Sequence, residues 1–176
     1  MRKIIFTAFN LLIITGLLMG QTKWTEITYS YQTGTVPPPH FYHYNFTVNS
    51  GGFGTLVYQP DYADTDTWVY TIKLSDQDIR KVDEAITKSK ILDETIPALA
   101  DTLRPIGGSL ESVTVMLTQD PNLDQMPQKI VTPEFPEEEY KEQLEKLYSV
   151  IKNLIPQCTW NEINERKDEY IKNYKQ

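Results

Sequence analysis

Residues 41–74 read FYHYNFTVNSGGFGTLVYQPDYADTDTWVYTIKL, and this stretch decides the fold. Aromatic and apolar residues alternate with polar ones in three runs. The alternating residues are Tyr42, Tyr44, Phe46 and Val48, then Leu56 and Tyr58, then Trp68, Tyr70, Ile72 and Leu74. A period of two is typical of strands in a sheet with one buried face. The connections at 49–52 and 60–64 are short and turn-forming, which favours antiparallel neighbours.

The same pattern extends to both sides of this stretch. A further strand over 27–31 precedes the prolines at 37–39, which completes a four-stranded antiparallel meander. Ser75 is a good N-cap for a helix that ends near Lys90. The later elements are a strand pair at 112–117 and 128–132, an amphipathic helix from Glu137 to about 155, and a last helix from Thr159. We therefore predict an α+β fold in which one or two C-terminal helices pack on the sheet.

The first 20 residues have the layout of a secretory signal peptide. Arg2 and Lys3 precede an apolar run over 4–19, and the small residue Gly20 then meets polar sequence. Residues 21–176 are predicted to form a single domain with a polar C-terminal helical tail at about 159–176. The protein is expected to be exported to the periplasm or secreted. The alternative is an uncleaved N-terminal segment that tethers the protein to the membrane.

The net charge of the chain excludes some classes of binding partner. Without Arg2 and Lys3 the mature chain carries 15 basic and 24 acidic residues, a net charge of −9. Such a surface repels nucleic acids and anionic lipids, so neither is an expected partner after signal cleavage. The single cysteine, Cys158, excludes an intrachain disulfide. Its apolar neighbours favour burial, and an exposed thiol would instead permit a weak dimer.

The chain carries no recognisable catalytic constellation, and we expect neither a metal nor a cofactor. His40 and His43 are the only histidines, and in an extended segment their offset points them to opposite faces. Asp61, Asp64 and Asp66 share one loop but do not have EF-hand spacing. The glycine-rich segment at 51–54 lies between strands and lacks the helix that a phosphate-binding loop needs.

The number of aromatic residues is the one compositional feature that suggests a binding surface, because most of these residues fall in the meander. Both faces of the strand around 41–46 carry rings, so one face can build the core and the other can bind a ligand. The candidate ligand-binding residues are Phe41, Tyr42, His43, Tyr44 and Tyr62. The alternative is that the C-terminal helices cover these rings and that they only stabilise the fold.

Several motifs resemble those of a group of small bacterial exported proteins. The motifs are VPPPHFYHYNF at 36–46, GTLVYQPDY at 54–62, the Trp-containing strand that leads into Leu74-Ser75, and PIGGSLESVTV at 105–115. This resemblance covers most of the mature chain. It implies a shared fold, and it brings no assigned activity with it.

These observations favour an exported, non-catalytic binding or accessory module. A glycan, another small molecule or a protein could each be its partner. The second alternative is a structural or inhibitor-like protein–protein interaction domain. The third is a hydrolase that uses scattered carboxylates, which are too abundant to be diagnostic.

The signal sequence predicts processing. When the full chain is expressed in a bacterial host, the protein should appear outside the cytoplasm without about 20 N-terminal residues. Cell fractionation and intact-mass measurement would show this. Full-length protein in the cytoplasm would contradict export, and full-length protein in the membrane would favour the tether.

Overall fold

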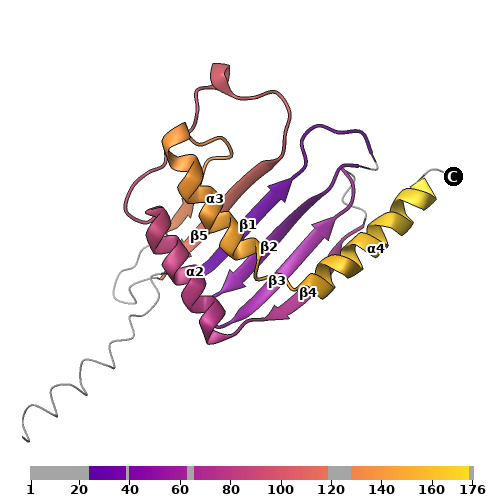
Figure 1. Cartoon of the computed structure of the whole chain (residues 1–176), viewed down its shortest axis with the longest axis horizontal. Helices are drawn as coiled ribbons and strands as arrows, with labels where there is room; N and C mark the ends of the chain where they lie inside the picture. Colours follow the sequence, from indigo (N-terminus) through magenta and orange to yellow (C-terminus); the bar gives the residue numbers. More distant parts are fainter. Residues whose placement is uncertain (1–23, 39, 63–65, 119–127, 175–176) are drawn as a thin grey trace, which may run out of the picture.

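A computed structural model of the chain describes residues 24–38, 40–62, 66–118 and 128–174 (Figure 1). Six strands form one antiparallel sheet in the order β4-β3-β2-β1-β5-β6. The strands are β1 (Trp24–Gln32), β2 (His43–Asn49), β3 (Phe53–Gln59), β4 (Trp68–Lys73), β5 (Leu110–Leu117) and β6 (Lys129–Val131). The predicted meander occupies one side of this sheet, and the later strand pair extends it beside β1.

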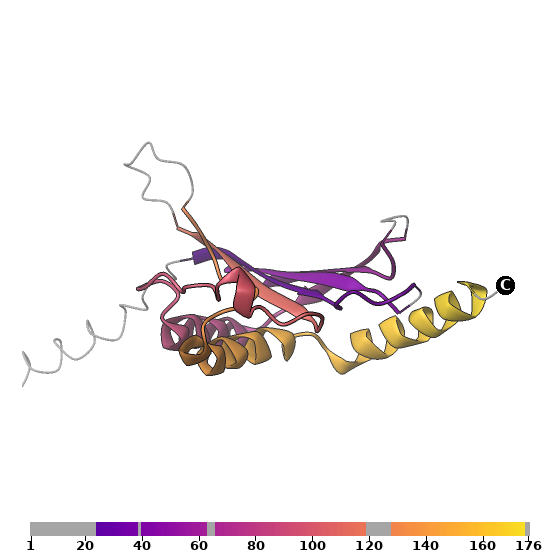
Figure 2. The ribbon, with the colours of Figure 1, turned by 90° about the horizontal axis from the view of Figure 1, so that it is seen from above.

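The α-helices of the described chain all lie on one face of the sheet, as Figure 2 shows from above. They are α2 (Asp76–Ser89), α3 (Glu138–Lys152) and α4 (Gln157–Tyr174), and a short 3-10 helix, η1 (Asp101–Leu103), interrupts the link between α2 and β5. The α+β fold predicted from the sequence is confirmed. Some boundaries differ: α4 begins at Gln157, directly after Pro156, and not at Thr159, α3 ends at Lys152 and not near 155, and β5 begins at Leu110 and not at 112.

The core forms between the sheet and the helices. Strand residues that alternate in the sequence pair across neighbouring strands, so that Phe46 faces Tyr29 of β1 and Leu56 of β3. All three side chains are fully buried. The helices complete the core with Val82, Ile86, Leu144, Leu147, Ile151 and Ile163. Removal of this apolar area from water is the main force that holds the layers together.

Local signals fix where α2 begins and ends. The Ser75 hydroxyl accepts a hydrogen bond from the backbone N–H of Asp78, and the Asp78 carboxylate accepts one from the backbone N–H of Ser75. This capping box satisfies two N–H groups that a helix start would leave unpaired. Lys90 ends the helix in the left-handed region, with a φ of 56°.

Two glycines are required by close contacts. A Cβ on Gly54 would lie 2.8 Å from the Phe46 ring, so that ring packs directly on the bare β3 backbone. A Cβ on Gly34 would lie 2.1 Å from the carbonyl oxygen of Gly108. The loop after β1 and the loop before β5 therefore touch backbone to backbone at Gly34. The glycines of the PIGGS motif, Gly107 and Gly108, are explained instead by their φ values of 85° and 91°.

The expectation that Cys158 is buried is wrong, because its side chain is exposed. Cys158 lies in the first turn of α4, on the exposed side of the helix, whereas Ile155, just before the helix, is buried. The thiol is therefore accessible on the surface.

Phe46 and Phe53 offer a matched test of this core. Phe46 is fully buried, whereas the side chain of Phe53, on the opposite face, is 54% exposed. Phe46→Ala should lower the free energy of unfolding by about 3–5 kcal/mol, because it leaves a cavity against Gly54. Phe53→Ala should change it by only about 0.5 kcal/mol. Chemical denaturation measures both values, and equal losses would contradict the assignment of the two faces.

Candidate functional site

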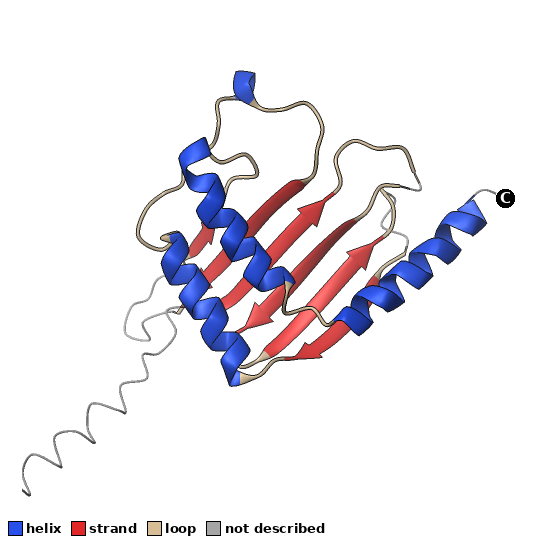
Figure 3. Ribbon diagram, in the orientation of Figure 1, coloured by secondary structure: helices blue, strands red, loops and turns tan. Residues whose placement is uncertain are grey.

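The sheet face opposite the helices is a broad polar surface, which we call the helix-free face. No helix of the described residues lies on it (Figures 2 and 3). It carries Ser, Thr, Asn and Gln side chains that alternate with the buried residues of each strand, together with exposed apolar and charged side chains such as Phe53, Val69 and Lys73. A row of paired threonines crosses five strands: Thr71, Thr55, Thr47, Thr28 and Thr114. The Thr28 and Thr47 hydroxyl oxygens are 2.9 Å apart and share a hydrogen bond.

An aromatic pair lies at one end of this face. The rings of Phe41 and Tyr62 stack with centroids 3.6 Å apart and an interplanar angle of 16°. Phe41 is only 4% exposed beneath Tyr62, whose side chain is 51% exposed. The Tyr62 hydroxyl donates a hydrogen bond to the carbonyl oxygen of Val36 at 2.9 Å. The ring of His43 lies beside Phe41, with centroids 5.8 Å apart.

The other two predicted site residues, Tyr42 and Tyr44, lie on the helix-covered face. Tyr44 is buried and meets Trp160 of α4 edge-on, with centroids 5.3 Å apart. The Lys167 ammonium lies 3.8 Å from the centre of the Tyr42 ring. The predicted set therefore divides: Phe41, His43 and Tyr62 come together, whereas Tyr42 and Tyr44 lie beneath α4.

A row of stacked rings continues from Tyr42 under α4. The ring centroids are 5.4 Å apart for Tyr42 and Tyr58 and 5.2 Å apart for Tyr58 and Trp68. The Arg166 guanidinium lies 4.5 Å from the centre of the Trp68 ring. Ile163 is the one fully buried side chain of this helix. Cation–π contacts and partly buried rings therefore contribute to its attachment, together with the hydrogen bonds of Arg166 to Tyr70 and of Tyr170 to Asp61.

Burial makes these tyrosines hard to ionise. Loss of hydration raises the pKa of Tyr42 to about 12, and it raises the pKa of Tyr58 and Tyr44 as well. The pKa of Tyr170 rises to about 12, first because of desolvation and then because its hydroxyl donates to the Asp61 carboxylate at 2.6 Å. Desolvation also lowers the pKa of Lys167.

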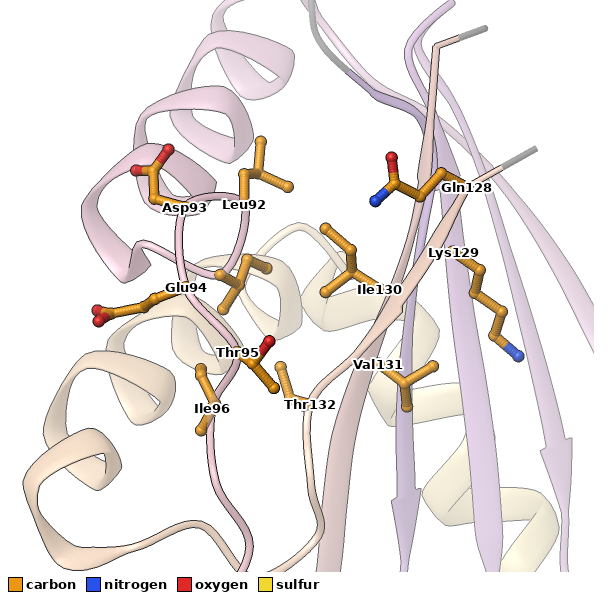
Figure 4. Close-up of a pocket in the computed structure, with 11 residues that line it drawn as sticks. Leu92, Asp93, Glu94, Thr95, Ile96, Gln128, Lys129, Ile130, Val131 and Thr132 are labelled. Atoms are coloured by element: carbon orange, nitrogen blue, oxygen red, sulfur yellow. The ribbon is translucent and has the colours of Figure 1, made fainter. Parts of the chain in front are cut away.

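The concavities of the described surface include two against α3 and one against β6. A groove of about 690 Å³ runs between α2 and α3, with charged residues such as Lys88 and Lys146 in its lining. A pocket of about 470 Å³ lies between α3 and the start of β5, and its lining includes Glu111, Tyr148 and Lys152. The third, of about 370 Å³, lies between the segment after α2 and β6. In Figure 4 its acidic side chains, Asp93 and Glu94, point away from Ile130, so its charged groups do not converge.

Sequence reasoning missed the cluster in the second pocket. The Lys152 ammonium lies 3.3 Å from the Glu111 carboxylate and 5.6 Å from the centre of the Tyr29 ring. These residues come from α3, β5 and β1, and no local motif joins positions so far apart in the chain. The helix-free face could have been found, since its threonines occupy the polar phase of each alternating strand.

The histidines and aspartates that the sequence offered as candidate metal ligands do not form a metal site among the described residues. His40 is exposed outside the strands, and His43 is half-buried in β2. Asp61 is buried and accepts the Tyr170 hydrogen bond, Asp66 is exposed, and Asp64 lies outside the described residues. Among the described positions, no group of three or more His, Cys, Asp or Glu side chains is arranged to hold a metal ion.

Comparison with models of known protein families and with curated proteins gives no match to this chain. Within the described ranges, no helix has the length and apolar character needed to cross a membrane. The functional argument therefore rests on the geometry of the surface.

The raised tyrosine pKa values predict a stability loss in alkali. In the unfolded chain these hydroxyls ionise near pH 10, whereas Tyr42, Tyr148 and Tyr170 ionise near pH 12 in the folded protein. The folded state binds more protons between these values, so the free energy of unfolding should fall as the pH rises from about 10 to about 12.

Chemical denaturation at several pH values measures this loss. Tyr170→Phe should show a smaller loss over the same range, since it removes one of these hydroxyls. A wild-type stability that stays constant up to pH 12 would contradict the burial of these rings.

Proposed function

We propose that the protein is an exported, non-catalytic binding module that recognises a neutral glycan on its helix-free face, at the end marked by Tyr62. The observation that carries the proposal is the half-exposed Tyr62 ring, which stacks on buried Phe41 beside a surface of uncharged polar side chains. A sugar ring presents an apolar C–H face that stacks on an aromatic ring. Its hydroxyl groups need neutral donors and acceptors around that contact.

The neighbouring positions supply such groups. Asn45 and Ser30 pair across β2 and β1, and Ser30 pairs with Ser112 of β5. His43 lies one step nearer to Phe41 and is paired with Gln32. Amide, hydroxyl and imidazole groups can both donate and accept hydrogen bonds, as a hydroxyl-rich ligand requires. The net charge of −9 in the mature chain disfavours an acidic polysaccharide.

Tyr62 is held in place before any ligand arrives. Its ring rests on Phe41 and its hydroxyl is anchored to Val36, next to the prolines at 37 and 38. A ring that is already fixed loses little conformational entropy on binding. Pre-organisation of this kind supports recognition at Tyr62 more than at Tyr42 or Tyr44, which α4 contacts.

One observation favours the alternative of a protein–protein interaction domain. Phe53, Val69 and Val131 lie on the helix-free face and are each more than half exposed. Exposed apolar side chains on one face can mark a protein interface. Because Cys158 is exposed, two copies of an exported chain could also be joined by a disulfide bond between their Cys158 residues.

Tyr62 and Tyr174 give a matched test of glycan binding. Their side chains are 51% and 53% exposed, and Tyr174 lies on α4, on the helix-covered side of the sheet. The mature protein should bind at least one neutral polysaccharide in a glycan array or by affinity electrophoresis. Tyr62→Ala should weaken this binding about tenfold or more, because aromatic contacts contribute on the order of 1 kcal/mol or more.

Tyr174→Ala should bind like the wild type and keep its melting temperature. Tyr62→Ala should melt at a somewhat lower temperature, because it uncovers Phe41 and removes the hydrogen bond to Val36, so binding is measured at a temperature at which all three proteins are folded. Equal binding by all three proteins would place the site elsewhere. If the protein binds no neutral glycan but captures an envelope protein through Val69, the protein-interaction alternative replaces the proposal.

A further inference from the structure

The pocket between α3 and β5 is a second site, distinct from the helix-free face. It lies on the helix-covered side, and its volume is about 470 Å³. One wall is a single stripe of α3 that includes Leu144, Tyr148 and Lys152, and the facing wall includes Glu111 of β5. Leu99 and Phe135 close it from the two connecting segments.

Backbone hydrogen bonds hold those connecting segments together. The N–H of Leu99 donates to the carbonyl oxygen of Phe135 at 2.8 Å, and the N–H of Glu137 donates to that of Pro97 at 3.2 Å. The Arg104 side chain adds a hydrogen bond to the carbonyl oxygen of Leu99. The apolar end of the pocket is therefore built by fixed structure.

The inner end of the pocket is polar. The Glu111 carboxylate and the Lys152 ammonium are 3.3 Å apart, and their side chains are 25% and 37% exposed. The Lys152 ammonium also lies 5.6 Å from the centre of the Tyr29 ring, which is fully buried behind the pocket.

The neighbouring polar groups are already satisfied. The Tyr148 hydroxyl shares a hydrogen bond with the Thr132 hydroxyl at 2.9 Å, and the Thr132 oxygen also accepts from the N–H of Val113 at 2.8 Å. Glu134 and Glu145, which also line the pocket, are exposed, and Lys141 pairs with Glu138. The partly buried charges that a ligand can meet are therefore Glu111 and Lys152.

We infer that this pocket binds a small zwitterion with an apolar side chain, which is the chemistry of a free hydrophobic amino acid. Its ammonium group would meet Glu111, its carboxylate would meet Lys152, and its side chain would lie against Leu144 and Phe135. In an α-amino acid one carbon atom joins the two charged groups, so they are adjacent, as the two protein charges are.

Charge balance selects this class over simpler ligands. A carboxylic acid that took Lys152 would leave Glu111 without its partner in a half-buried site, and an amine that took Glu111 would do the same to Lys152. Leaving a buried charge unpaired is costly. A zwitterion replaces both halves of the ion pair at once and leaves no charge uncompensated.

Calorimetry with L-leucine and two analogues of matched side chain tests this inference on the mature chain. Isoamylamine lacks the carboxylate of leucine, and isocaproate lacks its ammonium group. L-leucine should bind, and each analogue should bind about tenfold more weakly or worse. Glycine keeps both charges without the side chain and should also bind more weakly. Absence of binding by any hydrophobic amino acid, or equal binding by the analogues, would overturn the inference.

Variants locate the binding. Glu111→Gln and Lys152→Met should each weaken leucine binding about tenfold or more. Lys146→Met is the control, because Lys146 lies on the same helix and pairs with Glu142 on its exposed side. Wild-type affinity in both pocket variants would overturn the inference. If the pocket variants do not fold, the analogue series on the wild-type chain decides the question alone.

Discussion

The structure depends on the burial of one face of an antiparallel sheet. Tyr29, Phe46 and Leu56 lie on that face and are fully covered by the helices. Since side chains of a strand alternate between two faces, burial of one face leaves the other to water unless a second layer covers it. The described chain places its α-helices on a single side (Figure 2). The same constraint that builds the core therefore also creates the helix-free face.

The helix-covered side is not uniform. Leucine and isoleucine side chains of α3 pack into the core, whereas α4 rests on stacked rings through Trp160, Arg166 and Lys167. A cation over an aromatic face stays partly hydrated, so this attachment buries less apolar area than a leucine stripe does.

The two proposed sites differ in their physical basis. At Tyr62, the proposed recognition relies on a pre-positioned ring and on neutral hydrogen-bonding groups beside it. In the pocket, it relies on the half-buried ion pair of Glu111 and Lys152, which a ligand must replace without leaving either charge alone. We therefore expect weak binding of ligands of varied shape at Tyr62. In the pocket we expect binding that depends on the charges of the ligand.

The sequence by itself determined the α+β class, the meander, and the start and end of α2, because alternation, turn residues and caps are local signals. Local pattern also placed Phe41 and His43 on one face and Tyr42 and Tyr44 on the other. It did not say which face the helices would cover, and it misjudged Cys158, because both depend on how α4 docks. The pairing of Glu111 with Lys152 beside Tyr29 arises only when β1, β5 and α3 come together, since contacts between positions far apart in the chain are decided by tertiary packing.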